Sequence, residues 1–176
     1  MSGTEGDAIV EFYRGQRPDS EGRLLQDLWA WDDDALEAVH DYIQWLFPLA
    51  VPSGVNPDAP LVSPRTVAAF AGDPELRARL ARSFERMLAF YGLERVTAPA
   101  GVHIRRGSHF AARSRVWLRP FNHNFLRLTR ILTCLRTLGL PDEAAALFRC
   151  LEELVRSGAK DVIGDRTFDF WQRAAR

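Results

Sequence analysis

The sequence of 176 residues has few cysteines, almost no lysine and no long apolar run. Its two cysteines cannot build the disulfide framework of a small secreted domain, and they show neither a CxxC pair nor zinc-site spacing to histidine. The longest mostly apolar stretch without a charge, Tyr42 to Gly54, is shorter than the roughly 20 residues that a spanning helix needs. The first residues have no basic cluster before an apolar stretch, so no secretory signal is expected. We therefore expect a soluble, cytoplasmic protein.

The charges cancel in number but not in position. The chain has 23 acidic and 23 basic side chains, and every basic one except Lys160 is an arginine, as in proteins of GC-rich bacteria. Residues 1–60 hold 12 acids and three arginines, a net charge of −9, whereas residues 61–176 hold 11 acids and 20 basic residues, a net charge of +9. The segment from Arg95 to Arg136, called the arginine-rich segment below, has nine arginines, three of the four histidines and no acid.

Two interpretations of this layout stay open at the level of sequence. The acidic residues of 1–60 would cover the arginine-rich segment in the folded chain and neutralise it. Alternatively, part of the arginine-rich segment stays exposed and binds an anion, because guanidinium groups hold carboxylate and phosphate through paired hydrogen bonds.

The periodicity predicts an all-α fold, a single compact domain of about six or seven helices over residues 1–176. Residues 1–33 are expected to be an extended acidic and aromatic lead-in, and residues 34–176 the helical body, with a long loop at residues 93–121. Ser63 before Pro64, Asp73 before Pro74, and Gly92 are typical helix start and stop residues. The expected helices cover about residues 34–47, 64–72, 74–91, 122–138 and 141–157, and a last one begins near 165.

The helix expected to begin near Asn122 carries the candidate ligand-binding site. His123, Arg127 and Arg130 share one face of this helix, next to backbone amides that a helix start leaves free. The predicted ligand-binding residues are Asn122, His123, Asn124, Arg127 and Arg130, with Trp45 and Trp117 as walls.

Two of these residues have structural alternatives. Arg127 borders the apolar stripe of its helix, so it is alternatively a partly buried arginine paired with an acid of the N-terminal segment. Trp45 falls on the polar side of the expected helix 34–47, where it is either packed under the lead-in or exposed for a partner.

The sequence has no motif that points to catalysis, a cofactor or a metal. It contains no glycine-rich phosphate loop, no GxSxG, no HExxH and no CxxC. We therefore predict no catalytic residues and expect a binding protein, with an enzyme that uses histidine and carboxylate chemistry as an alternative. A nucleic-acid-binding domain is another alternative, because Phe110, Trp117 and Phe121 are interleaved with the arginines and would suit stacking on bases.

Several blocks of sequence resemble one family. They are the run from His40 to Leu49 (HDYIQWLFPL), Asn56-Pro57, Ala59 to Leu61, Met87 to Gly92 (MLAFYG) and Asn122 to Leu132 (NHNFLRLTRIL). In this order they are similar to the conserved region of opioid growth factor receptors, over about residues 11–175. The last block departs from the family's pattern by one inserted residue, Phe125, and the repeats and nuclear-localisation tail of the vertebrate proteins are missing.

The resemblance implies a receptor or binding module, and no enzymatic activity is established for the region that the family shares. Vertebrate members are described as receptors for an enkephalin peptide, located at nuclear and perinuclear membranes without spanning them. For this chain, whose composition suggests a bacterial source, we expect non-catalytic binding of an anionic small molecule or a peptide carboxylate at the arginine-rich segment. Membrane association is implied only by analogy with the vertebrate proteins.

Overall fold

A computed structural model describes residues 7–176 of the chain. Contacts between residues divide the chain into two compact units, Met1–Ser83 (unit 1) and Phe84–Arg176 (unit 2), with the boundary inside one helix. The described residues are mostly helical, as expected, with the addition of a two-stranded antiparallel sheet. No helix among them is long and apolar enough to cross a membrane. Each unit is described by itself.

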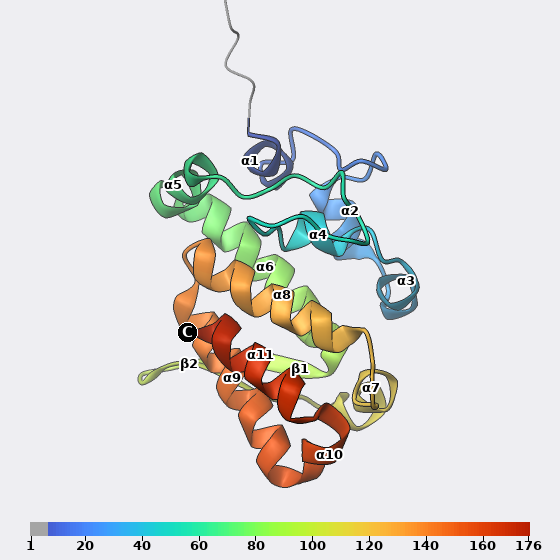
Figure 1. The fold of residues 1–176 in the computed structure, drawn as a ribbon. Coiled ribbons are helices and arrows are strands. Elements are labelled where there is room, and N and C mark those ends of the chain that lie inside the picture. Colours follow the sequence, from blue (N-terminus) through green and yellow to red (C-terminus); the bar gives the residue numbers. More distant parts are fainter. Residues whose placement is uncertain (1–6) are drawn as a thin grey trace, which may run out of the picture. The chain divides into compact units, whose positions relative to one another are not determined.

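Unit 1 is built from short helices, two of which lie in the segment expected to be extended (Figure 1). Their bounds are α1 Ala8–Tyr13, α2 Leu25–Ala30, α3 Asp33–Ala38, α4 Ile43–Leu46, α5 Pro64–Gly72 and the first part of α6 Pro74–Tyr91. Helix α1 begins at Asp7, whose carboxylate accepts the backbone N–H groups of Ile9 and Val10, and it packs against α5. The aromatic residues Phe12 and Tyr13 of the lead-in therefore lie on a helix, and both are fully buried.

The single helix expected at residues 34–47 is wrong, because the chain leaves helical geometry after Ala38. Val39 is extended, and α4 begins only at Ile43. Between the two helices, Asp41 is held by other segments: its carbonyl accepts the Nδ2 of Asn56 at 2.9 Å, and its carboxylate binds Arg23 at 2.9 Å. These contacts with distant residues replace the hydrogen bonds that a continuous helix would make.

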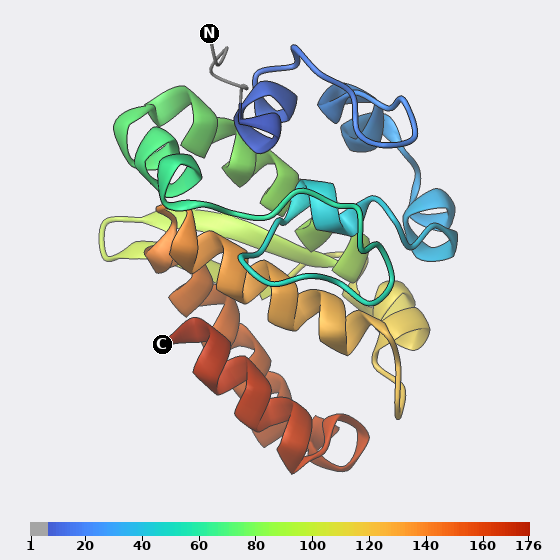
Figure 2. The same cartoon turned by 45° about the horizontal axis from the view of Figure 1, so that its top comes forward.

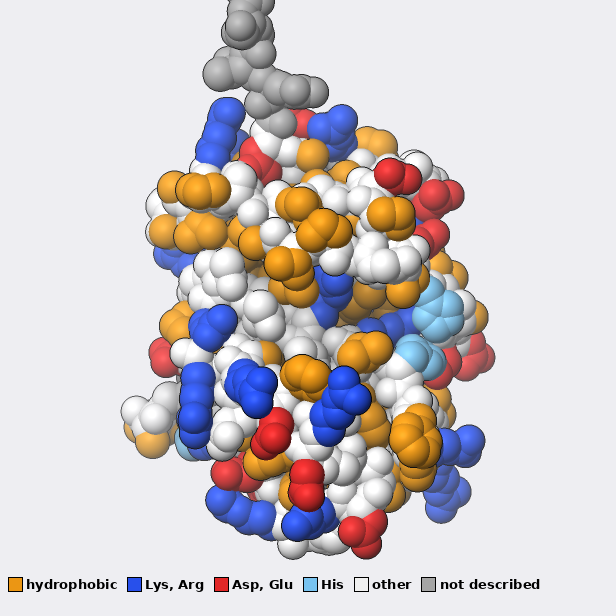
Figure 3. Space-filling model, viewed as in Figure 1, with side chains coloured by type: hydrophobic (Ala, Val, Ile, Leu, Met, Phe, Trp, Pro, Cys, Tyr) orange, Lys and Arg blue, Asp and Glu red, His pale blue; other side chains and the backbone are white. Residues whose placement is uncertain are grey.

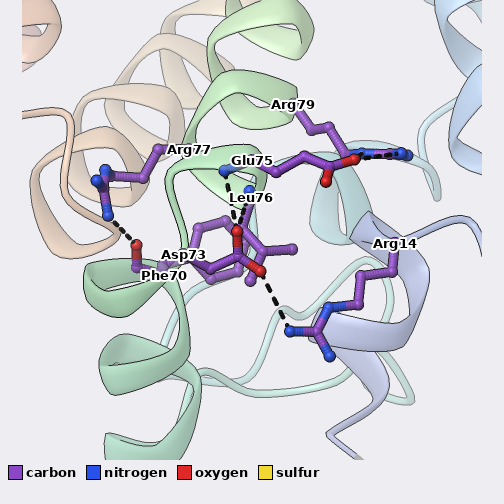
Figure 4. A network of polar contacts seen from close by, with 7 residues as sticks. All are labelled: Arg14, Phe70, Asp73, Glu75, Leu76, Arg77 and Arg79. Atoms are coloured by element: carbon purple, nitrogen blue, oxygen red, sulfur yellow. Dashed lines mark hydrogen bonds and ion pairs between the residues drawn. The ribbon is translucent and has the colours of Figure 1, made fainter.

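The helix starts predicted at Ser63, before α5, and at Asp73, before α6, are correct. The Ser63 hydroxyl accepts the N–H of Thr66 at the start of α5. Figure 4 shows Asp73 accepting the N–H groups of Glu75 and Leu76 at the start of α6 and binding Arg14 at 3.2 Å. The Arg14 guanidinium lowers the pKa of the Asp73 carboxyl. The Ser63 hydroxyl and the Asp73 carboxylate thus accept hydrogen bonds from the first backbone amides of α5 and α6, as N-cap residues do.

Unit 2 contains the rest of α6 and all remaining elements. They are β1 Leu93–Ala98, β2 Gly101–Arg106, α7 Phe110–Trp117, α8 Asn124–Thr137, α9 Pro141–Leu154, a π-helical turn Val155–Ala159, α10 Lys160–Ile163 and α11 Asp165–Ala175. Helix α8 packs against α9 and α11, and β2 packs against α9 (Figures 1 and 2). The described chain therefore has more and shorter helices than the six or seven expected.

The expected long loop at residues 93–121 is wrong, since a hairpin and a helix occupy it. Strands β1 and β2 pair from Leu93 opposite Arg106 to Ala98 opposite Gly101. Only Leu93 and Ile104 are buried in this hairpin, so its sequence has little of the alternation that marks a strand. Gly92 has a φ of +75°, and α7 lies so close that a Cβ at this position would be 2.7 Å from the Cα of Phe110.

Four tryptophan indoles anchor the two units through hydrogen bonds. In unit 1, Trp29 Nε1 donates to Ser83 Oγ at 2.9 Å, and Trp45 Nε1 donates to Ser20 Oγ at 3.0 Å. In unit 2, Trp117 Nε1 donates to the carbonyl of Tyr91 and Trp171 Nε1 to the carbonyl of Phe125, both at 3.0 Å, and both side chains are fully buried.

Candidate functional site

The residues at the start of α8 form hydrogen bonds with one another and with the end of α7. Asn122 Oδ1 accepts the backbone N–H of Asn124 at 2.9 Å, and Asn122 Nδ2 donates to the Val116 carbonyl at 3.1 Å. The next amides, those of Phe125 and Leu126, donate to the carbonyls of Asn122 and His123 at 3.1 Å. These backbone amides, which were predicted to be available to an anion, therefore donate hydrogen bonds within the first turn.

Arg127 and Asn124 are core residues. Arg127 is only 5% exposed and Asn124 is fully buried, and Arg127 Nη1 donates to Asn124 Oδ1 at 3.3 Å. A guanidinium held in this way fixes the first turn of α8 and presents little surface to a ligand. Arg127 is thus buried, as in its structural alternative, and the pairing with an acid of the N-terminal segment stays a prediction.

His123 and Arg130 keep part of their surface on the face predicted from the helical spacing. Both are of intermediate exposure. Burial lowers the pKa of Arg130, with the Cys134 thiol acting weakly in the opposite direction, yet a guanidinium stays charged at neutral pH. With Asn122, which is also of intermediate exposure, they are the members of the predicted α8 site that are not buried.

The two tryptophans predicted as walls are packing residues, each inside its own unit. Trp117 is fully buried, with its ring 5.3 Å from the Tyr91 ring in an edge-to-face arrangement. Trp45 is 6% exposed and its ring lies 5.3 Å from that of Phe12 in the lead-in. Trp45 is thus packed under the lead-in, which was one of its two alternatives.

Some arginines of the arginine-rich segment pair with acids of unit 2. Arg95 binds Glu143 at 3.0 Å and lies 3.8 Å from Glu85, and Arg105 binds Glu94 at 2.9 Å. These acids lie outside the arginine-rich segment or at its edge in the sequence, and the fold of unit 2 brings them to it.

Three exposed arginines near α7 have no such pairing. Within the described part of the chain, residues 7–176, no ion pair joins Arg106, Arg115 or Arg119 to a carboxylate. They come from the end of β2, from α7 and from the turn after α7. Figure 3 shows basic and hydrophobic side chains next to one another at the place of α7. We call Arg106, Arg115 and Arg119 the α7 arginines.

An exposed aromatic residue accompanies the α7 arginines. Phe121 is fully exposed and has a φ of +60°, a left-handed conformation that is uncommon for a residue with a side chain. Leu126, on the first turn of α8, is 72% exposed. The sequence pointed to Phe121 only as a stacking residue for nucleic acid, and its neighbours Arg115 and Arg119 were not singled out because nothing in their spacing distinguishes them.

The described residues show no group of three or more histidine, cysteine, aspartate or glutamate side chains that could hold a metal ion. Both cysteines are buried and reduced, and burial raises the pKa of both thiols, so neither is a reactive nucleophile near neutral pH.

Comparisons with known proteins point to one family. The family model described as the opioid growth factor receptor (OGFr) conserved region matches residues 8–176. The chain is 38% identical to the opioid growth factor receptor of Mus musculus, over 88% of this chain and 25% of the relative. It is 36% identical to that of Homo sapiens, over 95% and 25%, and 31% identical to the opioid growth factor receptor-like protein 1 of Mus musculus, over 74% and 28%. No solved structure matches significantly. The chain spans about a quarter of the length of these relatives.

Proposed function

Because the chain belongs to the family of the opioid growth factor receptor conserved region, we propose that it is a non-catalytic binding module for an anionic ligand. The ligand class is a peptide carboxylate or a small carboxylate or phosphate. The relatives are named receptors, and a receptor binds its ligand without transforming it. The name speaks for those proteins, so the role of this chain depends on its own surface.

One observation carries this proposal: three exposed guanidinium groups occur within 14 residues, and no carboxylate pairs with them in the described part of the chain. An exposed arginine that already pairs with an acid has little to gain from an anion. An unpaired one forms charge-assisted hydrogen bonds, which contribute about 1.5–3 kcal/mol each where water is partly excluded. The α7 arginines therefore form the part of the arginine-rich segment best suited to bind an anion.

The predicted α8 residues take a different part in the same proposal. Asn122, Asn124 and Arg127 hold the start of α8 in place, and the side chains of His123 and Arg130 are of intermediate exposure beside it, with the His123 Nε2 atom buried. We propose that a ligand longer than a single carboxylate extends from the α7 arginines toward His123 and Arg130. Trp45 and Trp117 contribute packing only.

Isothermal titration of the full chain tests this function. The probes are inorganic phosphate, a nucleotide, and short peptides with a free or an amidated C-terminus. We expect measurable binding of a carboxylate or phosphate probe, and a loss of about tenfold in affinity for Arg115→Gln combined with Arg119→Gln. Arg173→Gln is the matched control, because Arg173 is exposed on α11 and lies outside the arginine-rich segment. Absence of binding by every probe, or equal binding by both variants, overturns the proposal.

Binding of a nucleic acid by the same arginines is the competing hypothesis, and its dependence on salt tests it. Binding through phosphates would lose affinity steeply between about 50 and 200 mM salt, since each neutralised phosphate releases counterions. A gel shift with single-stranded DNA at low salt, with no complex formed, removes this competitor. A complex that is tighter than any peptide complex and loses about a thousandfold in affinity over that salt range replaces the proposal.

A further inference from the structure

A hollow of about 250 Å³ lies in unit 2 between the end of β2, α7, and the π-helical turn with α10. Its lining combines one arginine with apolar side chains, namely Arg106, Phe110, Leu118, Leu154 and Val162, and with backbone of the π-helical turn. The volume is below the roughly 300–1,000 Å³ of sites for drug-sized ligands. The hollow therefore has room for about one side chain and its end group.

The π-helical turn shapes one wall of this hollow. Helix α9 ends at Leu154, and the chain kinks within the next five residues, Val155–Ala159, where Gly158 leaves helical geometry with a φ of +118°. Ser157 Oγ donates to the carbonyl of Leu154 at 3.2 Å, which holds the turn against the end of α9.

Arg106 is held in a fixed position at the hollow. Its Nη2 donates to Ser157 Oγ at 2.6 Å, and its guanidinium carbon lies 5.1 Å from the centre of the Phe110 ring. These two contacts use one N–H and one face of the group. In the described part of the chain no carboxylate binds Arg106, so its other N–H groups are open to a ligand. A guanidinium that is already positioned loses less conformational freedom when it binds an anion.

The apolar wall beside Arg106 defines the rest of the ligand. Leu154 is buried, and Leu118 and Val162 are partly exposed at the rim. An apolar group that fills the hollow removes this surface from water, and a carboxylate attached to it reaches the guanidinium. Phosphate alone would leave the apolar wall without a partner.

We infer that this hollow binds a carboxylate attached to a short aliphatic group, with Arg106 as the carboxylate-binding residue. The inference rests on the proposed function and adds the ligand chemistry and its place. A peptide with a C-terminal aliphatic residue and a free aliphatic carboxylic acid both carry this chemistry. Of the α7 arginines, Arg106 is the one that lines this hollow, so it determines specificity there while Arg115 and Arg119 add general attraction for anions.

Titration of the full chain with two pairs of probes tests the inference. The first pair is N-acetyl-leucine and its amide, and the second is a tetrapeptide that ends in leucine, as the free acid and as the amide. We expect each acid to bind at least tenfold more tightly than its amide. Tighter binding of the tetrapeptide than of N-acetyl-leucine identifies a peptide C-terminus as the source, and equal binding identifies a small acid.

Variants separate the two features of the hollow. Arg106→Gln removes the carboxylate contact and Val162→Trp fills the apolar space, and we expect each to weaken binding of the acids at least tenfold. Arg149→Gln is the matched control, because Arg149 is an exposed arginine of the same unit whose guanidinium donates to the Val102 carbonyl. Arg106→Lys keeps the charge without the paired geometry, and it replaces Arg106→Gln if that variant does not fold by circular dichroism.

The outcomes distinguish this inference from the proposed function. If the acids bind and only Arg115→Gln with Arg119→Gln weakens them, the hollow is not the site and the proposed function stands. If amides bind as tightly as acids, the carboxylate assignment is overturned. If no anionic probe of any kind binds, the proposed function and the inference fail together.

Discussion

Cys150 gives unit 2 a pH dependence at the residue scale. Burial, with a smaller effect of Glu153, raises the pKa of its thiol from 9.0 to about 11. In the unfolded chain the thiol ionises above pH 9, whereas in the folded chain it stays protonated up to about pH 11. The stabilisation is therefore complete below pH 9 and is lost as the pH rises through this window, by up to about 1.4 kcal/mol per pH unit.

Urea unfolding at pH 7.5, 9 and 10 measures this dependence. We expect Cys150→Ala to make the fall in unfolding free energy between pH 9 and 10 shallower by about 1 kcal/mol than in the unaltered chain. Cys134 is buried with a raised pKa as well, so part of the fall stays in the Cys150→Ala variant. Equal slopes in the two proteins would show that the Cys150 thiol ionises alike in the folded and unfolded chains.

The candidate site at α8 shows what residue types and spacing can predict. The helical spacing predicted one shared face for His123, Arg127 and Arg130. It gave no information on whether that face meets solvent, because the depth of each residue depends on the elements packed around α8. Arg127 is buried for this reason, although the same spacing left it free to be a ligand contact.

Gly92 joins two elements and determines whether they can pack. It ends α6, its carbonyl accepts the N–H of Gly107 at 2.9 Å, and α7 approaches within 2.7 Å of where its Cβ would lie. Gly92→Ala is expected to destabilise the chain by more than about 2 kcal/mol, because a left-handed residue acquires a side chain and α7 must move.

Gly158→Ala is the matched control for this variant. Gly158 also has a positive φ, but a Cβ there would meet nothing within 4 Å, so only the backbone strain of about 1 kcal/mol is expected. The difference in urea unfolding free energy between the two variants measures the steric contribution of α7. Equal losses of unfolding free energy in the two variants would show that α7 moves away from the Cβ added at Gly92 without destabilising the chain.

Element boundaries set by local chemistry were predictable, and those set by distant contacts were not. The starts of α5 and α6 follow from Ser63 and Asp73, whose side chains bond the amides two or three residues on. The interruption between α3 and α4 depends on Asn56, which is 15 residues away from Asp41 and gives no signal in a helical pattern. The hairpin was missed because its strands are mostly exposed.

The same interruption explains the unusual position of Trp45. The helical projection of residues 34–47 placed Trp45 on the polar side only because it assumed one continuous helix. In the structure α4 begins anew at Ile43, so Trp45 has its own orientation and is buried. The wrongly predicted helix therefore placed a buried tryptophan on a polar face.

At the scale of the whole molecule, zero net charge is the sum of two opposite halves. Acids of residues 1–60 pair with Arg17 and Arg23 within unit 1, and Arg95 and Arg105 pair with acids within unit 2. Whether the acidic half also covers the arginine-rich segment stays a prediction. The α7 arginines are the part of that segment on which both proposals depend.

The expected single domain stays a prediction as well, and it has a direct test. A single domain opens both units together, so their buried groups are expected to have the same free energy of opening, within about 1 kcal/mol. The indole N–H groups of Trp117 and Trp171 in unit 2 form buried hydrogen bonds, and that of Trp45 in unit 1 forms a part-buried one with the Ser20 hydroxyl, so these three are compared. Much faster hydrogen–deuterium exchange at Trp45 alone would show that unit 1 unfolds independently.

The tryptophan hydrogen bonds thus give the molecule built-in reporters. Each indole N–H gives a separate resonance in a proton–nitrogen NMR spectrum, in a region where few other groups appear. Trp117 lies in α7, the helix that carries Arg115 and lines the hollow beside Arg106 through Phe110. Its indole N–H donates to the carbonyl of Tyr91 at the end of α6. Ligand titration and unfolding can therefore be followed in one sample without any added label.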